Sequence, residues 1–419
     1  MIRGVLQRIA IKGFKSLVNV ELELPPLVVL AGPNASGKSN VLDAIQMLAR
    51  SGTQRTLADA LGPPIRGFPA EAFTLPSGGL PALMAQPTAS FSIEADLAVG
   101  HAGNGNAVER IRYRVGIDID PDEGVLSLAD EYLTRLTKDR QPKDTPRIEV
   151  AGSELILRRS GGGGRPPHEQ LGANHTLLSD ARLSGSSYPL FDVVRDELRL
   201  WRTYYLDPQT AMRAEAPPRE VADIGVRGEH VAPFLHGLKT RSPQAFAAVA
   251  RSLKSIVPAI DALDVSLDTK RGTLDLQITQ DGTTFSSRVV SEGTLRVLAL
   301  CAIAVTATSG LFAFEEPENG VQPQRLDRIA ELLASAAQRG RGQIVVTTHS
   351  PGFVAAILSR AQDQRDVGLF SVSRDGRSTV IKQMKDFGLW HETAVAELLN
   401  EPDDYDKVSA LVRRGWLDL

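Results

Sequence analysis

The sequence is nearly without cysteine and has no long apolar run. Its 419 residues include one cysteine, Cys301, which stands inside an apolar stretch. A single thiol excludes a disulfide framework and a cysteine metal site, and its surroundings predict a buried side chain in a reducing cytosol. No window approaches the roughly 18 apolar residues that a membrane-spanning helix needs, and the N-terminus lacks the apolar region of a signal peptide. We therefore expect a cytoplasmic protein without a membrane partner.

The chain also has no excess of either charge. It contains 47 basic and 50 acidic residues, for a formal net charge of −3. This balance provides no global attraction to DNA or to an anionic membrane, so any binding of nucleic acid must be local or depend on a partner. The length predicts either two domains or one large α/β domain with insertions.

The first half of the chain reads mainly as strands. Alternating apolar residues from Val5 to Leu24, interrupted by "KGFKS", predict a β-hairpin. A short apolar strand, a glycine loop and a helix follow within residues 25–51, and residues 52–88 predict a long irregular connection. Three later stretches alternate again, and we expect them to form an inserted antiparallel sheet. They are residues 90–99, 110–119 and 147–159, followed by a glycine-rich flexible loop at 158–170.

The second half reads as βα units. A helical section runs through residues 233–260, with Pro243 as a helix start, and a hairpin is expected around Asp281 and Gly282. An apolar helix then extends to Ala307. Beyond it strands and helices alternate, which predicts a parallel sheet. The expected elements are strands at 311–314, 343–349 and 368–373, helices at 323–338 and 351–361, and two short helices in the last thirty residues.

The stretch "GPNASGKS", Gly32 to Ser39, fits the pattern G-x-x-x-x-G-K-[ST]. A strand precedes it and a helix follows it, so a chance glycine turn is disfavoured. Backbone N–H groups of such a loop and the helix dipole can bind phosphate, Lys38 can bridge β and γ phosphates, and Ser39 can be a ligand for Mg²⁺. The candidate nucleotide-binding residues here are Gly32, Pro33, Asn34, Ala35, Ser36, Gly37, Lys38, Ser39 and Asn40.

Two adjacent acids follow the strand pattern in "LFAFEEPENG". At the carboxyl end of a strand in a P-loop enzyme, the first acid, Glu315, orients the Mg²⁺ shell and the second, Glu316, can polarise the attacking water. The alternative is an acidic first turn that complements a helix dipole. The intact P-loop favours the catalytic interpretation.

A histidine ends the strand pattern in "IVVTTHSP". At the same edge of the sheet, His349 could hydrogen-bond the γ phosphate and report its presence. A lone histidine is more often structural, and the other motifs are what favour the site interpretation.

The stretch "VVSEGTLRVLAL", Val289 to Leu300, has two interpretations. Ser291 and Thr294 can serve the start of a helix whose leucines are core. Alternatively, the turn is there to contact something outside its own helix.

Taken in chain order, these motifs resemble those of ATP-binding-cassette (ABC) ATPase heads. More narrowly, the chain resembles the AAA-named, ABC-type ATPases related to the overcoming lysogenization defect (OLD) family, to RecF and to the SMC heads. The stretches that carry the resemblance are "IAIKGFKSL", "LAGPNASGKSNVLDAI", "VVSEGTLRVLAL", "FAFEEPENGVQP" and "VVTTHSP". The resemblance implies an α/β P-loop fold with a mostly parallel core sheet, an inserted antiparallel β subdomain and a helical subdomain.

The resemblance also implies a role for each matched residue. Lys38 and Ser39 match the Walker A ligands, Glu315 the Walker B acid, Glu316 the catalytic base, Asn319 and Gly320 the D-loop, and His349 the switch histidine. Ser291, Gly293 and Thr294 match the signature motif, which in these heads contacts the ATP of the opposite protomer. The implied active unit is a head-to-head homodimer, or a higher homo-oligomer, with symmetric composite sites.

Two positions differ from the transporter ATPases. Glu315 stands where they carry Asp, and the signature reads Ser-Glu-Gly-Thr where they carry Ser-Gly-Gly-Gln, which favours the DNA-associated and defence branch. The Q-loop glutamine stays open between Gln209 and Gln86. OLD proteins also carry a Toprim nuclease domain, for which the tail after residue 385 is too short. Asp404 and Asp406 in that tail are typical of a solvated acidic helix start.

We expect an ATPase head over residues 1–385 and a helical tail over 386–419. The head is expected to comprise a P-loop segment (1–60), an antiparallel β subdomain with its return to the core (88–215), a helical and signature subdomain (216–310), and the Walker B and switch-histidine segment (311–385).

The leading hypothesis is a sensor or regulatory ATPase whose dimer closes on ATP and opens on hydrolysis. A separately encoded effector, nuclease or toxin-like, would act in anti-phage or abortive-infection defence. The alternative is a repair or recombination ATPase of the RecF kind that clamps duplex DNA, since a basic groove can coexist with a neutral total charge. A third hypothesis, a transporter subunit, is disfavoured by the two departures.

Overall fold

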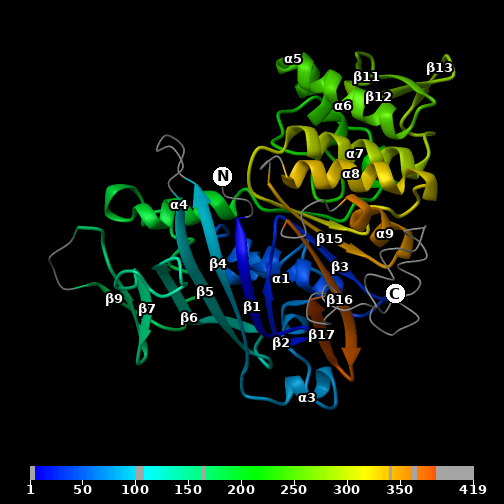
Figure 1. The fold of residues 1–419 in the computed structure, drawn as a ribbon. Helices are drawn as coiled ribbons and strands as arrows, with labels where there is room; N and C mark the ends of the chain where they lie inside the picture. Colours follow the sequence, from blue (N-terminus) through cyan, green and yellow to red (C-terminus); the bar gives the residue numbers. More distant parts are fainter. Residues whose placement is uncertain (1–4, 101–107, 162–165, 339–341, 361–365, 384–419) are drawn as a thin grey trace. The chain divides into compact units, whose positions relative to one another are not determined.

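The computed structural model describes residues 5–100, 108–161, 166–338, 342–360 and 366–383 (Figure 1). The chain divides into two compact units, each built from separated stretches. Unit 1 contains residues 1–25, 34–201 and 372–382, and unit 2 contains residues 26–33, 202–371 and 383–419. The predicted tail helices, with Asp404 and Asp406, lie outside the described residues.

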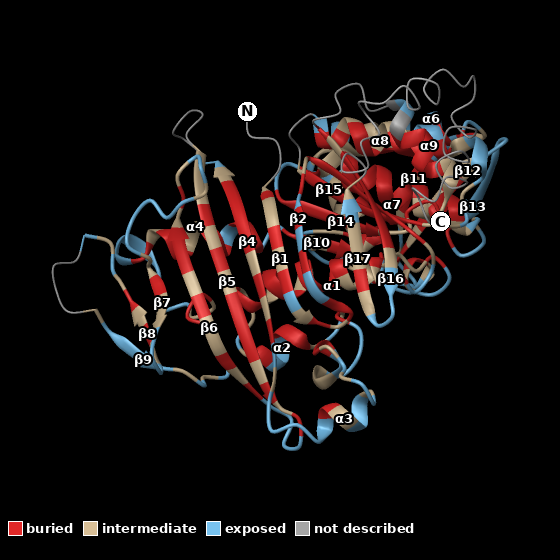
Figure 2. Cartoon of the chain, turned by 60° about the horizontal axis from the view of Figure 1, so that its bottom comes forward, coloured by how far each residue is buried: buried red, intermediate tan, exposed pale blue. Residues whose placement is uncertain are grey.

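Unit 1 is built on an eight-stranded antiparallel sheet of order β2-β1-β4-β5-β6-β7-β8-β9. Alternation gives it one buried face: the side chains of Ile111, Tyr113 and Val115 on β5 are fully buried, as Figure 2 shows by the alternating colours along the long strands. The strands are β1 (Leu6–Phe14), β2 (Leu17–Glu23), β4 (Ala89–Gly100), β5 (Val108–Asp120), β6 (Val125–Arg135), β7 (Ile148–Ala151), β8 (Glu154–Leu157) and β9 (His168–Gln170). The predicted hairpin and the three predicted strand regions are confirmed, whereas β6 was not predicted.

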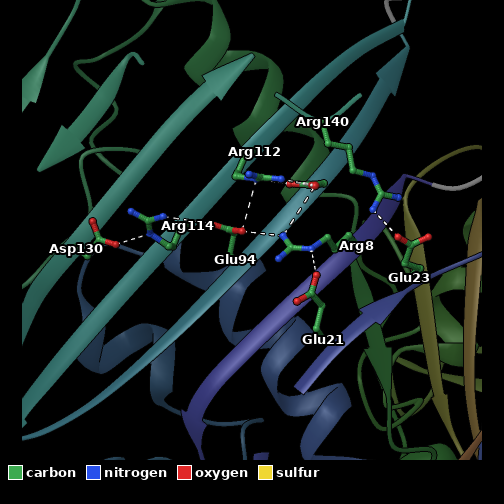
Figure 3. Close-up of polar contacts among 9 residues, drawn as sticks. Arg8, Glu21, Glu23, Glu94, Arg112, Arg114, Asp130 and Arg140 are labelled. Atoms are coloured by element: carbon green, nitrogen blue, oxygen red, sulfur yellow. Dashed lines mark hydrogen bonds and ion pairs between the residues drawn. The ribbon is translucent and has the colours of Figure 1, made fainter. Parts of the chain in front are cut away.

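The other face of this sheet carries a ladder of ion pairs (Figure 3). Arg8 on β1 lies 2.7 Å from Glu94 on β4, and Arg112 on β5 donates two hydrogen bonds, of 2.6 and 2.8 Å, to Asp96. Arg114 donates to Glu94 at 3.2 Å and packs its guanidinium over an aromatic ring. Further pairs join Arg8 to Glu21, Arg114 to Asp130 and Arg140 to Glu23. The arginines drawn on this face are therefore committed to carboxylates.

The helices of unit 1 begin with the helix after the P-loop. They are α1 (Lys38–Ser51), α2 (Leu57–Leu61), α3 (Leu80–Met84) and α4 (Pro189–Leu198), with short 3₁₀ turns at Pro69–Ala72 and Gly185–Ser187. Helix α1 buries Val41, Leu42 and Ile45, as its spacing predicts. The interpretation of residues 52–88 as irregular is wrong in part, because α2 and α3 lie there. Thr56 starts α2 by accepting a hydrogen bond from the Asp59 backbone.

Unit 2 contains the parallel strands. The sheet order is β10-β14-β15-β3-β16-β17, and β10, β14, β15, β3 and β16 are paired in parallel. The strands of this sheet are β3 (Leu27–Ala31), β10 (Arg202–Tyr204), β14 (Leu311–Glu315), β15 (Gln343–Thr348), β16 (Val367–Asp375) and β17 (Ser378–Gln383). The end of β16, from Val372 on, and β17 up to Lys382 are assigned to unit 1. Every residue of β3 and β15 is buried, which explains why both appear in the sequence as unbroken apolar runs. The predicted parallel βα units are confirmed.

Helices and a small antiparallel sheet complete unit 2. The helices are α5 (Val231–Arg241), α6 (Pro243–Ile256), α7 (Glu292–Thr306), α8 (Leu326–Gln338) and α9 (Pro351–Arg360), with 3₁₀ turns at Ala211–Arg213 and Pro323–Arg325. The small sheet consists of β11 (Ile260–Asp268), β12 (Thr273–Gln280) and β13 (Thr283–Ser286). Cys301 is fully buried in α7, and burial raises the pKa of its thiol far above its ordinary value. None of the helices within the described ranges is both long and apolar enough to cross a bilayer.

Candidate nucleotide site

The P-loop starts where β3 ends. In unit 2, Ala31 pairs with Thr348 on β15, and the Gly32 backbone donates a hydrogen bond of 3.1 Å to the carbonyl of Thr348. In unit 1, the loop makes two left-handed turns, at Ala35 (φ 63°) and at Gly37 (φ 103°), before α1 begins at Lys38. Left-handed turns of this kind allow consecutive backbone N–H groups to face one concavity.

The residues of this loop fit a phosphate group. In the described structure, α1 starts without a side-chain cap and without an acid in its first turn, so its dipole is left to an external anion. The Ser36 hydroxyl is buried and has no hydrogen-bond partner among the described residues. The Lys38 side chain is only 4% exposed. An uncapped helix start beside a buried lysine is the donor set that a nucleotide phosphate requires.

A hydrogen-bonded cluster that the motif does not reveal supports the loop from behind. The Thr379 hydroxyl donates to the Ser36 carbonyl at 2.9 Å and lies 2.6 Å from the Ser16 hydroxyl. Ser16 in turn accepts a hydrogen bond of 2.7 Å from the Asn40 side chain. Ser16 and Thr379 are both buried. The loop is therefore fixed by residues from the two ends of the described chain.

The acidic pair lies at the carboxyl end of β14 in unit 2. Glu315 is the last residue of the strand, opposite Thr347. Glu316 follows in a left-handed conformation (φ 44°) that is unusual for a residue with a side chain. Its backbone N–H donates to the carbonyl of Thr347 at 3.1 Å and faces the Thr347 hydroxyl at 3.2 Å. Strain of this kind persists where surrounding contacts enforce it and is concentrated at functional sites.

Both carboxylate oxygens of Glu316 are held by side chains. The His349 ring nitrogen Nδ1 lies 2.8 Å from Oε1, and the Asn319 amide donates to Oε2 at 2.6 Å. A carboxylate accepts at both oxygens, so Nδ1 of His349 carries the proton in this contact. The structure thus brings together three residues that the sequence assigned to different motifs.

A further residue of the loop after β14, Glu318, was not singled out from the sequence. Its side chain is 5% exposed, and its Oε1 accepts a hydrogen bond from the Thr348 hydroxyl. Burial raises the pKa of Glu318 to about 7, although the Thr348 hydrogen bond opposes the shift. The only sequence signal was its place inside the motif "EEPENG".

The signature residues form the start of α7. Ser291 is the N-cap, and its hydroxyl accepts a hydrogen bond from the Thr294 backbone at 3.3 Å. The first interpretation of this stretch, as the start of a helix, is therefore confirmed. Gly293 packs against the D-loop so closely that an added Cβ would lie 2.2 Å from the Gly320 carbonyl oxygen. Arg296, one turn along, donates to the backbone carbonyl of Asn319.

The two Q-loop candidates fall in different units. Gln209 follows β10 in unit 2, and its amide donates to Glu292 of the signature turn at 2.9 Å. Gln86 is exposed after α3 in unit 1. Gln209 is the candidate that contacts the turn carrying the predicted signature residues, through Glu292, which was not itself a predicted site residue.

The predicted site residues are divided between the units, and the P-loop itself is split, with Gly32 and Pro33 in unit 2 and the residues from Asn34 on in unit 1. Lys38, Ser39 and Asn40 belong to unit 1, and the acids, His349 and the signature turn belong to unit 2. Within the described ranges, no three histidine, cysteine or acidic side chains are grouped so that they could hold a metal by themselves.

Similarity to solved structures extends over most of the chain. The Smc head bound to the C-winged helix domain of ScpA has a TM-score of 0.51 and 14% identity, covering 90% of this chain and 97% of that chain. A Smc head domain with an extended coiled coil, bound to the C-terminal domain of ScpA derived from Pyrococcus furiosus, has a TM-score of 0.49 and 12% identity, covering 93% and 100%. The first likeness establishes a P-loop ATPase α/β fold with mixed sheets.

Similarity to curated sequences is short. The DNA replication and repair protein RecF of Listeria welshimeri serovar 6b is 44% identical over 55 residues, which is 13% of this chain. The matched segment spans only 15% of that relative's length. A family model described as "AAA domain, putative AbiEii toxin, Type IV TA system" matches residues 27–355, well over half of the chain. The chain therefore belongs to this AAA domain family, whose P-loop ATPase fold it shares with the Smc heads.

Proposed function

We propose that this protein binds and hydrolyses ATP with Mg²⁺, and that ATP joins two copies head to head. The observation that carries the proposal is the fixed carboxylate of Glu316, held by His349 and Asn319 at the end of a parallel strand. A carboxylate held at both oxygens is oriented before the reaction, as a base that positions water must be.

The other roles are assigned to residues whose surroundings suit them. Lys38 and the N–H groups around Gly37 would bind the phosphates, and Ser39 with Glu315 would hold Mg²⁺. The bound metal would supply charge neutralisation at the β and γ phosphates. Glu316 would orient the attacking water and accept its proton, while His349 would keep the carboxylate in position. Gln209, beside the signature turn, is the better Q-loop candidate.

The signature turn supports the paired arrangement. Ser291 is exposed, and the neighbouring Val289 has 71% of its surface exposed although it is apolar. A helix start with hydroxyls and an exposed apolar neighbour suits a contact with the ATP and surface of a second copy. Two identical composite sites follow from the two-fold symmetry of such a pair.

For the biological role we propose control of a separately encoded effector, nuclease or toxin-like, in anti-phage or abortive-infection defence. The family description, which names a type IV toxin–antitoxin system, supports this direction. A relation to the OLD family is also part of the proposal. So is the division of residues 1–385 into P-loop, β, helical and Walker B segments.

Lys38→Ala tests the nucleotide site directly. Removing the buried ammonium should abolish ATP turnover and weaken ATP binding at least about tenfold, because a charge-assisted phosphate contact is lost. The measurements are phosphate release and a titration with ATP. Lys12→Ala, which removes an exposed lysine from β1, is the matched control and should behave as the wild type. Equal turnover in wild type and Lys38→Ala would refute the assignment.

The second candidate is a DNA-clamping ATPase, favoured by the short RecF match. The ion-pair ladder on the unit 1 sheet weighs against that face as the DNA surface, because its arginines already neutralise carboxylates (Figure 3). Duplex binding that falls steeply with salt would favour this candidate, and its absence at low salt would favour the effector model.

A further inference from the structure

The buried carboxyl of Glu318 has no role among those assigned above. Its Oε1 accepts from the Thr348 hydroxyl, and its Oε2 is buried without a partner among the described residues. Thr348 is fully buried, and its hydroxyl also accepts a hydrogen bond of 3.0 Å from the Ser350 backbone. The hydrogen bond of Glu318 therefore joins the loop after β14 to the end of β15.

The position of this hydrogen bond in the two segments is informative. Glu318 immediately precedes Asn319, and Thr348 immediately precedes His349. Asn319 and His349 are the two side chains that hold the oxygens of Glu316. A single buried hydrogen bond thus joins the two backbone segments that carry Asn319 and His349.

We propose that Glu318 is a positioning residue for Glu316, which acts through Thr348 to keep Asn319 and His349 at a fixed separation. The inference rests on the proposed function, because it assumes that Glu316 is the base. Glu318 itself touches neither the nucleotide nor the reacting water in this scheme.

Burying the Glu318 carboxyl lowers the stability of the fold, which supports a role for this residue beyond packing. A buried carboxyl with one unpaired oxygen destabilises a fold relative to an apolar side chain of similar size. Features that break local rules in this way are expected at functional sites. Arg296 approaches the same loop from α7 and donates to the Asn319 carbonyl, so the loop is held on a second side as well.

The test is a double-mutant cycle on ATP turnover with Glu318→Ala, Thr348→Val and the double variant. Each single change should lower kcat about tenfold or more and leave KM within about threefold, because the P-loop is untouched. The double variant should be no slower than the slower single variant, since the two side chains act through one bond. Glu318→Gln and Thr348→Ser retain an acceptor and a donor and should recover most of the turnover.

Thr306→Val is the control for loss of a threonine hydroxyl in unit 2. That hydroxyl donates to the Ala302 carbonyl at 2.7 Å near the end of α7, and kcat should not change. Multiplicative effects of the two single variants, or wild-type kcat in Thr348→Val, would overturn the inference while leaving the ATPase intact. If the wild type turned over ATP no faster than Lys38→Ala, the proposed function would be refuted. The inference about Glu318 would then be refuted as well. Glu318→Gln keeps the test decisive if Glu318→Ala does not fold.

Discussion

At the scale of single residues, Gly37 determines how closely the P-loop can approach its support. Its φ of 103° is rare for residues with a side chain, and a Cβ there would lie 2.0 Å from the Thr379 hydroxyl and 2.9 Å from that of Ser16. The glycine is thus required both by the turn and by the contact behind it. The motif predicts the turn, and only the structure reveals the contact.

Thr379→Val tests that contact. The substitution keeps the side-chain volume but removes the hydroxyl that donates to the Ser36 carbonyl. A buried polar group left unpaired costs about 1–3 kcal/mol, so affinity for ATP should fall roughly tenfold, while Thr379→Ser should bind as the wild type. Calorimetric titration with ATP measures both. Unchanged affinity in Thr379→Val would show that the support is dispensable.

The sequence predicted where the candidate site residues stand in the fold better than it predicted their mutual contacts. Glu316 and His349 could each be placed at a strand end, because strand ends follow from local apolar runs. The hydrogen bond between His349 and Glu316 depends on the rotamers of two side chains that are 33 residues apart in the sequence. The bond between Ser16 and Thr379 spans 363 residues, and no local pattern encodes it.

At the scale of elements, β6 shows why one strand escaped prediction. The pairing of β6 with β5 changes register between Gly116 and Ile117, and at that point the alternation of buried and exposed side chains along β6 is interrupted. One inward position is taken by Glu131, whose carboxylate accepts from the backbones of Leu177 and Leu178 at 2.6 and 3.0 Å. A register shift and a buried acid both break the alternation that reveals a strand. Strands without such a break, such as β4 and β5, were predicted.

Helix α4 carries a pH-dependent contribution to stability. Glu197 is 7% exposed, accepts a hydrogen bond of 3.1 Å from the Trp201 indole, and has its pKa raised by burial to about 7. Because the folded pKa lies above the unfolded value of 4.5, the folded protein binds the proton more tightly, and stability falls as pH rises from the unfolded to the folded pKa.

Glu197→Gln should remove that loss, since the amide oxygen still accepts from the indole and carries no charge. Between pH 5 and 8, the wild type should lose up to roughly 3 kcal/mol relative to the variant. Urea unfolding of both proteins at a series of pH values measures the difference. Parallel stability curves for the two proteins would contradict the buried-acid explanation.

At the scale of the whole molecule, the two units are each assembled from stretches far apart in the sequence. Motif order could suggest consecutive segments, but the return of residues 372–382 to unit 1 depends on long-range contacts such as those of Thr379 with Ser16. The balanced charge, −3 overall, agrees with a sheet face on which arginines and carboxylates pair. The central claim of the proposed function is that ATP joins two copies head to head.

Glu316→Gln with ATP tests that claim most directly. The amide keeps the size of the carboxyl but cannot accept a proton, so ATP should bind without being hydrolysed and hold two copies together. Light scattering after size exclusion should give a dimer with ATP and Mg²⁺ and a monomer without ATP. Glu316→Gln combined with Lys38→Ala should stay monomeric in both conditions. A Glu316→Gln protein that binds ATP yet remains monomeric at saturation would contradict the head-to-head model.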